Sequence, residues 1–147
     1  KEGINLRVGA PAVAHIDHLG LAVKSIAQAR RFYESLGLVV AHEEEVQQEG
    51  VRTAMLPLGD SRIELLEPLA EDTPVGRFLA RHGEGLHHVA IHVEDISATF
   101  DEMKRSGVKL ASPAIQTGAG GHLYFFVHPA SASGALVEIC QDPPAHA

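Results

Sequence analysis

Two histidines and two glutamates have the types and the spacing that could hold a metal ion. The same order of a histidine and a later glutamate occurs twice along the chain, first as His18 and Glu64 and then as His88 and Glu138. Neutral imidazoles and carboxylates suit divalent Mn, Fe, Co, Ni or Zn, and they differ from the thiolate cages of structural zinc. The four side chains therefore predict one mixed nitrogen and oxygen metal site.

Each of these glutamates lies in an apolar run, Glu64 in IELL and Glu138 in VEIC. Burying a carboxylate is costly unless it is paired, protonated or bound to a cation. Strand alternation could instead turn either glutamate toward solvent, which is the simpler interpretation of each one taken alone. The double occurrence of the pattern favours the metal site.

A metal held by these ligands would keep positions open for a substrate carbonyl and polarise it. Removal of a proton from the adjacent carbon would then give a metal-stabilised enolate, and a glutamate beside the metal is placed to act as the base. The reaction class that we expect is proton transfer at a carbon acid.

The elements that must position these residues repeat along the chain. Each histidine begins a predicted strand, which a helix follows after an N-cap oxygen from Ser25 or Asp95; a short helix is also predicted from Thr73-Pro74 to about Arg81. The predicted strands span residues 15–23, 38–46, 51–58 and 62–66, then 86–93, 108–111, 123–127 and 136–140. The sequence therefore predicts an α+β fold of two βαβββ modules, at about 15–70 and 86–141.

Length and composition limit the class of protein. The chain has 147 residues, so we expect a tail at residues 1–14 and a single domain over 15–147. A net charge of −7 with 12 Lys and Arg argues against nucleic acid, and no apolar run approaches the roughly 18 residues of a membrane span. A small-molecule partner is therefore expected.

The single cysteine, Cys140, cannot form an internal disulfide, which suits a reducing compartment. We expect a cytoplasmic protein. The sequence begins at Lys1 rather than Met, so an organellar matrix reached through a removed leader stays open as an alternative.

The remaining chemical groups give weaker signals. His87 is expected to point to the opposite face from His88, while His122 carries no spacing argument and Cys140 reads as a small core residue. The acidic run 43–45 is most simply a solvated strand end, although one member could face the cavity. Residues 118–121 (GAGG) lack the context of a phosphate loop, but they could form a flexible rim for an anion.

From His15 to about Gln141 the chain resembles the methylmalonyl-CoA epimerase family, part of the vicinal oxygen chelate superfamily that also holds glyoxalase I. The segments that carry the resemblance are HIDHLGLAV (15–23), GDSRIELLEP (59–68), GEGLHHVA (83–90), GAGG (118–121) and the stretch 128–138. The resemblance implies paired βαβββ modules that form a curved mixed sheet around a divalent metal, usually in a homodimer.

The resemblance also implies the site and the reaction. His18, His88 and Glu138 would be metal ligands with Glu64 as the fourth, and the ion would be Co, Mn, Zn or Ni. The reaction would interconvert (2R)- and (2S)-methylmalonyl-CoA by 1,1-proton transfer, as in propionate metabolism, with an acyl-CoA as the partner. Inversion needs a proton removed on one face and returned on the other, so we expect Glu138 and Glu64 to be the catalytic pair.

The sequence departs from the family pattern at two positions. Some members have a further catalytic glutamate where this chain offers Thr53, which leaves one of the two bases open. Many members have a lysine just after the His-Pro pair, where this chain has Ala130, so the contacts to coenzyme A are also open.

Three other functions compete with this interpretation. A glyoxalase I-type lactoylglutathione lyase would use the same metal and glutamate chemistry, although the extended matches favour the epimerase. An extradiol dioxygenase would use two histidines and one glutamate on Fe(II), usually in a longer chain. A metal-free ligand-binding relative would need no matched histidine and glutamate pairs.

Overall fold

The computed structural model describes residues 14–143 of the chain, so all but the last residue of the predicted tail lies outside the described part. The described residues form two compact units: one covers Asp17–Val89, and the other joins residues 14–16 to residues 90–143. They follow the two predicted modules closely. The prediction of a single domain over residues 15–147 stays a prediction.

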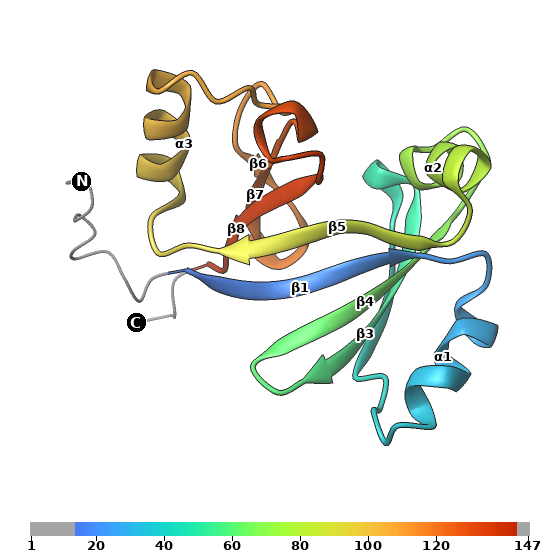
Figure 1. The fold of residues 1–147 in the computed structure, drawn as a ribbon. Coiled ribbons are helices and arrows are strands. Elements are labelled where there is room, and N and C mark those ends of the chain that lie inside the picture. Colours follow the sequence, from blue (N-terminus) through green and yellow to red (C-terminus); the bar gives the residue numbers. More distant parts are fainter. Residues whose placement is uncertain (1–13, 144–147) are drawn as a thin grey trace. The chain divides into compact units, whose positions relative to one another are not determined.

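The unit Asp17–Val89 contains the first βαβββ module, and its strands follow the order β2-β3-β4-β1-β5. β1 pairs with β4 in parallel, whereas β2 with β3 and β3 with β4 are antiparallel (Figure 1). Its elements are β1 (His15–Ala22), α1 (Ile26–Glu34), β2 (His42–Val46), a 3-10 turn (Gln47–Glu49), β3 (Val51–Leu58), β4 (Ser61–Pro68), α2 (Pro74–His82) and the start of β5 (Gly85–His92).

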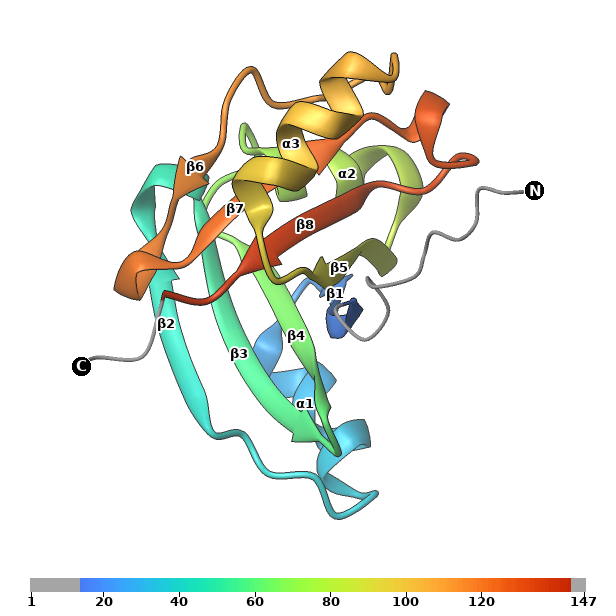
Figure 2. The same ribbon diagram turned by 90° about the vertical axis from the view of Figure 1, so that its left-hand side faces the viewer.

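The other unit continues from β5 in the strand order β5-β8-β7-β6, with α3 packed along β8 (Figure 2). Its elements are α3 (Ile96–Arg105), β6 (Gln116–Thr117), a 3-10 turn (Ala119–Gly121), β7 (Leu123–Val127), a 3-10 turn (Pro129–Ser131) and β8 (Val137–Gln141). The order β-α-β-β-β in both units confirms the predicted α+β class and its two modules.

The helices begin where the sequence predicts them. Ser25 Oγ accepts a hydrogen bond from the backbone of Gln28, and Asp95 Oδ1 accepts one from Ala98. Thr73 caps α2 in the same way through Gly76 N–H. Such caps satisfy backbone donors that the first helical turn leaves without partners.

The predicted strand 38–46 starts too early and the predicted strand 108–111 is wrong, at the same point of each module. β2 starts only at His42, so residues 38–41 are not strand. In residues 108–111 there is no strand, and Leu110 alone forms an isolated bridge, with Val127. Leu38 N–H bonds back to Tyr33 and Val108 N–H to Met103, each after a glycine with φ near 90°. These apolar residues therefore close the preceding helices instead of starting strands.

Each unit has its own apolar core on one face of its strands. In the first, β3 and β4 contribute Ala54, Leu56, Ile63 and Leu65 beneath α1. In the second, Phe100 of α3 packs edge-on against Phe125 of β7. Because side chains alternate along a strand, Glu64 lies on the opposite face from its neighbours Ile63 and Leu65.

In residues 14–143, no helix is long and apolar enough to cross a membrane.

Candidate metal centre

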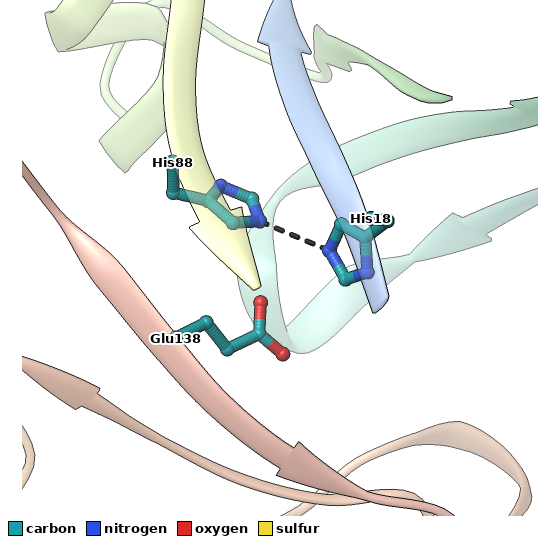
Figure 3. A group of neighbouring side chains, drawn as sticks. All are labelled: His18, His88 and Glu138. Carbon is teal, nitrogen blue, oxygen red and sulfur yellow. Dashed lines mark hydrogen bonds between the residues drawn. The ribbon is translucent and has the colours of Figure 1, made fainter. Parts of the chain in front are cut away.

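His18 of β1 and His88 of β5 face each other in the unit Asp17–Val89. Their Nε2 atoms are 3.1 Å apart, and their rings meet edge to face (Figure 3). Both residues are buried, at 4% and 7% exposure. The neighbouring strands thus bring together two histidines that are far apart in the sequence.

The buried carboxylate of Asp17 contacts the Nδ1 atom of His18, on the side of the ring away from His88. His18 Nδ1 donates to Asp17 Oδ2 at 2.7 Å, and Arg62 of β4 forms an ion pair with the same oxygen. Burial raises the pKa of Asp17, but the hydrogen bond from His18 and the charge of Arg62 outweigh it and hold the pKa at about 2. Asp17 is therefore ionised, and it orients the His18 ring with Nε2 toward His88.

His88 is held through its Nδ1 atom as well. This atom lies 2.9 Å from Nδ1 of His87, whose ring packs against Phe78 of α2. Each central imidazole is thus oriented by the residue that precedes it in sequence. Such hydrogen bonds to the distal ring nitrogen are typical of metal-binding histidines.

The donor chemistry of this pair fits a divalent cation. Asp17 accepts a hydrogen bond from His18 Nδ1, so a neutral His18 carries a lone pair on Nε2, directed at His88 Nε2. Two ring nitrogens in this position need either a shared proton or a cation between them. A divalent ion in place of the proton would satisfy both lone pairs.

Gly20 makes room for the His88 ring. A Cβ atom at this position would lie 2.3 Å from His88 Cε1, which is closer than van der Waals contact allows. The absence of a side chain at Gly20, two residues after His18 on β1, therefore leaves room for the His88 imidazole beside this strand.

Glu64 joins the histidine pair from β4. Its Oε1 atom is 3.6 Å from His18 Nε2, and its side chain is 19% exposed. The register places Glu64 beside Gly20 on one side and Met55 on the other, so all three share the face of the sheet that carries His18. The unit Asp17–Val89 therefore brings together three of the four predicted site residues.

Glu138 of β8, labelled in Figure 3, belongs to the other unit. It is buried, with 6% exposure, and pairs with Phe126 of β7. Its Oε2 atom lies 3.5 Å from His122 Nε2. Its role as a ligand beside His18 and His88 stays a prediction.

The acidic run of β2 is divided between the two faces of the sheet. Glu44 is paired with Thr53 in the register, on the face of Glu64, and lies 3.1 Å from His42 Nε2. Glu43 contacts Arg30 and Glu45 contacts Arg52 instead. Thr53, which we expect from the resemblance to replace a further glutamate, lies on the face that carries Glu64.

Sequence reasoning missed the residues that orient the candidate ligands. Asp17 directly precedes His18 in the run HIDH, and an acidic residue beside a candidate ligand could have identified it. Arg62 gave no such signal, because its contact with Asp17 depends on the pairing of β1 with β4.

Comparison with known proteins gives consistent matches. Residues 17–126 match the family model described as Glyoxalase/Bleomycin resistance protein/Dioxygenase superfamily. Methylmalonyl-CoA epimerase, mitochondrial, of Bos taurus is 33% identical over 88% of this chain and 75% of that protein. The ethylmalonyl-CoA/methylmalonyl-CoA epimerase of Cereibacter sphaeroides is 34% identical over 88% of this chain and 98% of its own length.

A solved structure agrees with these relatives. A variant of Streptomyces coelicolor methylmalonyl-CoA epimerase, in complex with 2-nitronate-propionyl-CoA, superposes with a TM-score of 0.83 at 34% identity. The match covers 90% of this chain and 100% of that chain.

Proposed function

Because the chain belongs to the Glyoxalase/Bleomycin resistance protein/Dioxygenase superfamily, we propose that it is a metal-dependent epimerase that interconverts (2R)- and (2S)-methylmalonyl-CoA. The epimerases of Bos taurus and Cereibacter sphaeroides, both above 30% identity, support an isomerase of this class. The complex of the Streptomyces coelicolor enzyme supports an acyl-CoA as the small-molecule partner. We also propose that the protein acts as a homodimer.

The observation that carries the proposal is the buried pair of His18 and His88 with Glu64 beside it. Their nitrogen atoms are 3.1 Å apart and the carboxylate is 3.6 Å from one of them. Two imidazoles suit a borderline divalent cation, and the carboxylate of Glu64 would lie beside that cation. Enolisation next to a thioester carbonyl needs both.

In this proposal His18, His88 and Glu138 are the ligands of a divalent ion, Co, Mn, Zn or Ni, with Glu64 as the fourth. When bound, the ion supplies a positive charge that polarises the thioester carbonyl. Asp17 and His87 contact the Nδ1 atoms of the two imidazoles and orient the Nε2 atoms toward this position.

Glu138 and Glu64 carry the protons in this proposal. One carboxylate removes the C2 proton from one face of the substrate, and the electron pair moves onto the carbonyl oxygen. The other carboxylate returns a proton to C2 from the opposite face, so the configuration inverts. The first proton stays on the carboxylate that took it until it exchanges with solvent.

Isotope exchange tests the reaction directly. Metal-loaded protein in D₂O is expected to interconvert the two epimers of methylmalonyl-CoA and to introduce deuterium at C2, measured by NMR and mass spectrometry. A glutathione hemithioacetal serves as the control substrate. Turnover of the control alone would reassign the enzyme as a lactoylglutathione lyase, and turnover of neither would favour a ligand-binding relative.

The metal is tested separately by elemental analysis. The purified protein is expected to hold about one divalent ion per chain, and His88→Ala is expected to lose it, since each imidazole is an essential ligand. Full metal content and full activity in His88→Ala would contradict the site.

A further inference from the structure

A second group of metal-ligating side chains lies in the unit that contains β7 and β8. One ligand atom from each of His122, Glu138 and Cys140 lies within 4.8 Å of the other two. Glu138 and Cys140 are both buried, at 6% and 1% exposure, and the His122 side chain is 25% exposed. This group contains a thiol, which the histidine pair of β1 and β5 does not.

The strand register explains why these side chains meet. Glu138 and Cys140 are two residues apart on β8, so they share one face, and their partners on β7 are Phe126 and Tyr124. His122 comes just before β7 and stacks on Tyr124, with ring centroids 5.9 Å apart. The stacking places the imidazole over the row formed by Glu138 and Cys140.

The edge of the group is polar and open to solvent. Asp142 directly follows β8, its Oδ1 atom is 3.6 Å from His122 Nδ1, and its side chain is 63% exposed. The His122 ring thus lies between two carboxylates, with Nε2 at 3.5 Å from Glu138. An ion can approach from the exposed side of His122 and Asp142.

We propose that His122, Glu138 and Cys140 bind a thiophilic divalent cation such as zinc, and that this binding inhibits the enzyme. Thiolate, imidazole and carboxylate are the ligands that zinc takes in proteins, and the sulfur favours softer ions over Mn or Mg. Binding replaces the proton of Cys140 Sγ with the metal and releases that proton to solvent.

The distances fit such an ion after a small contraction. Bond lengths of about 2.0–2.3 Å in a tetrahedral site place ligand atoms roughly 3.3–3.8 Å apart. The three ligand atoms here lie within 4.8 Å, so each needs to move by less than about 1 Å. Side-chain rotation of Glu138 and His122 supplies this movement.

Inhibition follows because the two metal sites share Glu138. This part of the inference rests on the proposed function, in which Glu138 is both a ligand and a proton carrier. A zinc ion that His122 and Cys140 also hold would be a second cation on Glu138, so it would engage a further electron pair and make this carboxylate a weaker base than the first ion alone does. The binding part does not depend on the reaction.

Cobalt spectroscopy tests the binding. Titration of the metal-free chain of 147 residues with Co²⁺ is expected to produce a near-ultraviolet sulfur-to-cobalt charge-transfer band. Cys140 is the single cysteine of the chain, so the band can have one source. Cys140→Ala and Cys140→Ser are expected to lose the band, His122→Gln to weaken Co²⁺ binding at least tenfold, and His88→Ala to keep the band.

Two outcomes would overturn the binding site. The first is the absence of a charge-transfer band in the folded unmodified chain. The second is a band that is unaffected by His122→Gln, which would leave Cys140 as an isolated ligand. Circular dichroism of each variant shows whether it is folded, and the two replacements of Cys140 guard against a loss that comes from misfolding.

Zinc titration of the manganese-loaded enzyme tests the inhibition. The ratio of activity with and without Zn²⁺ is compared within each variant, and Cys140→Ala is expected to need at least tenfold more zinc for half inhibition. Equal zinc sensitivity in both proteins would refute the inhibitory role. An unmodified chain that shows the cobalt band but does not epimerise methylmalonyl-CoA would refute the proposed function and leave the binding site in place.

Discussion

The two modules place a histidine and a glutamate in the same order of elements, but they surround them differently. In the first module, His18 contacts Asp17, which also forms an ion pair with Arg62. The side chain of Glu64 is 19% exposed. In the second, Glu138 is only 9% exposed at its side chain and contacts His122. The repeat thus supplies equivalent positions, and the neighbours of each position determine what the residue can do.

The difference between the two glutamates has a chemical consequence. Two carboxylates in unequal environments can take separate roles as acid and base, since burial and hydrogen bonding change their basicity. Glu138 contacts His122, whereas Glu64 contacts His18, which Asp17 orients. We therefore expect Glu138 to be the more sensitive of the two to substitution.

The largest effect is expected from Glu138→Gln. Loss of a general base reduces rates by roughly 10²–10⁴-fold, and loss of a metal ligand adds to this. Deuterium exchange at C2 should fall below detection from both epimers, as measured by NMR. Glu64→Gln should stop interconversion but keep exchange from the one epimer whose proton Glu138 removes.

Glu102→Gln, on the exposed face of α3, is the matched control and should retain full activity. Exchange that survives in Glu138→Gln while Glu64→Gln abolishes it from both epimers would reverse the assignment of the two glutamates. The comparison between the modules would then stand with the roles exchanged.

A smaller effect is expected from Asp17→Asn, which breaks the support of His18 and leaves the ligands in place. Substituting the group that orients a ligand typically weakens metal affinity by roughly 10–100-fold. Competition with a chromophoric chelator measures the change. Asp101→Asn, an exposed aspartate of α3, should bind the metal as the unmodified chain does. Unchanged affinity in Asp17→Asn would mean that the ion pair with Arg62 serves stability alone.

The sequence predicted those features that arise from local patterns. The caps at Ser25 and Asp95 and the order of the two modules are recovered. The strand expected over 38–46 begins only at residue 42 and the strand expected over 108–111 is absent, because a short apolar run after a helix serves equally well to close it.

The supporting residues of the site depended on pairing between distant segments. Arg62 reaches Asp17 because β1 and β4 pair in parallel, with Leu19 opposite Ile63, and no spacing in the sequence shows this. His122 reaches Glu138 through the pairing of β7 with β8. A periodic pattern indicates which face a side chain takes, whereas its contacts across strands follow from the register.

The smallest effect is expected at the helix caps, where the modules are most alike. Ser25→Ala and Asp95→Ala each remove a side-chain acceptor for one backbone N–H, at 3.2 and 3.0 Å, and each should lower the free energy of unfolding by about 1 kcal/mol. Asp95 also places a negative charge at the N-terminus of α3, so its loss should cost a few tenths of a kcal/mol more. Urea unfolding measures both.

Asp95→Ser separates the two contributions, since it keeps the acceptor and removes the charge. It should recover most of the stability that Asp95→Ala loses, and the remaining deficit should disappear at high salt, where the interaction with the helix dipole is screened. A deficit in Asp95→Ser as large as that of Asp95→Ala would mean that the charge, and not the hydrogen bond, is what caps α3. The two modules would then begin their helices by different physical means.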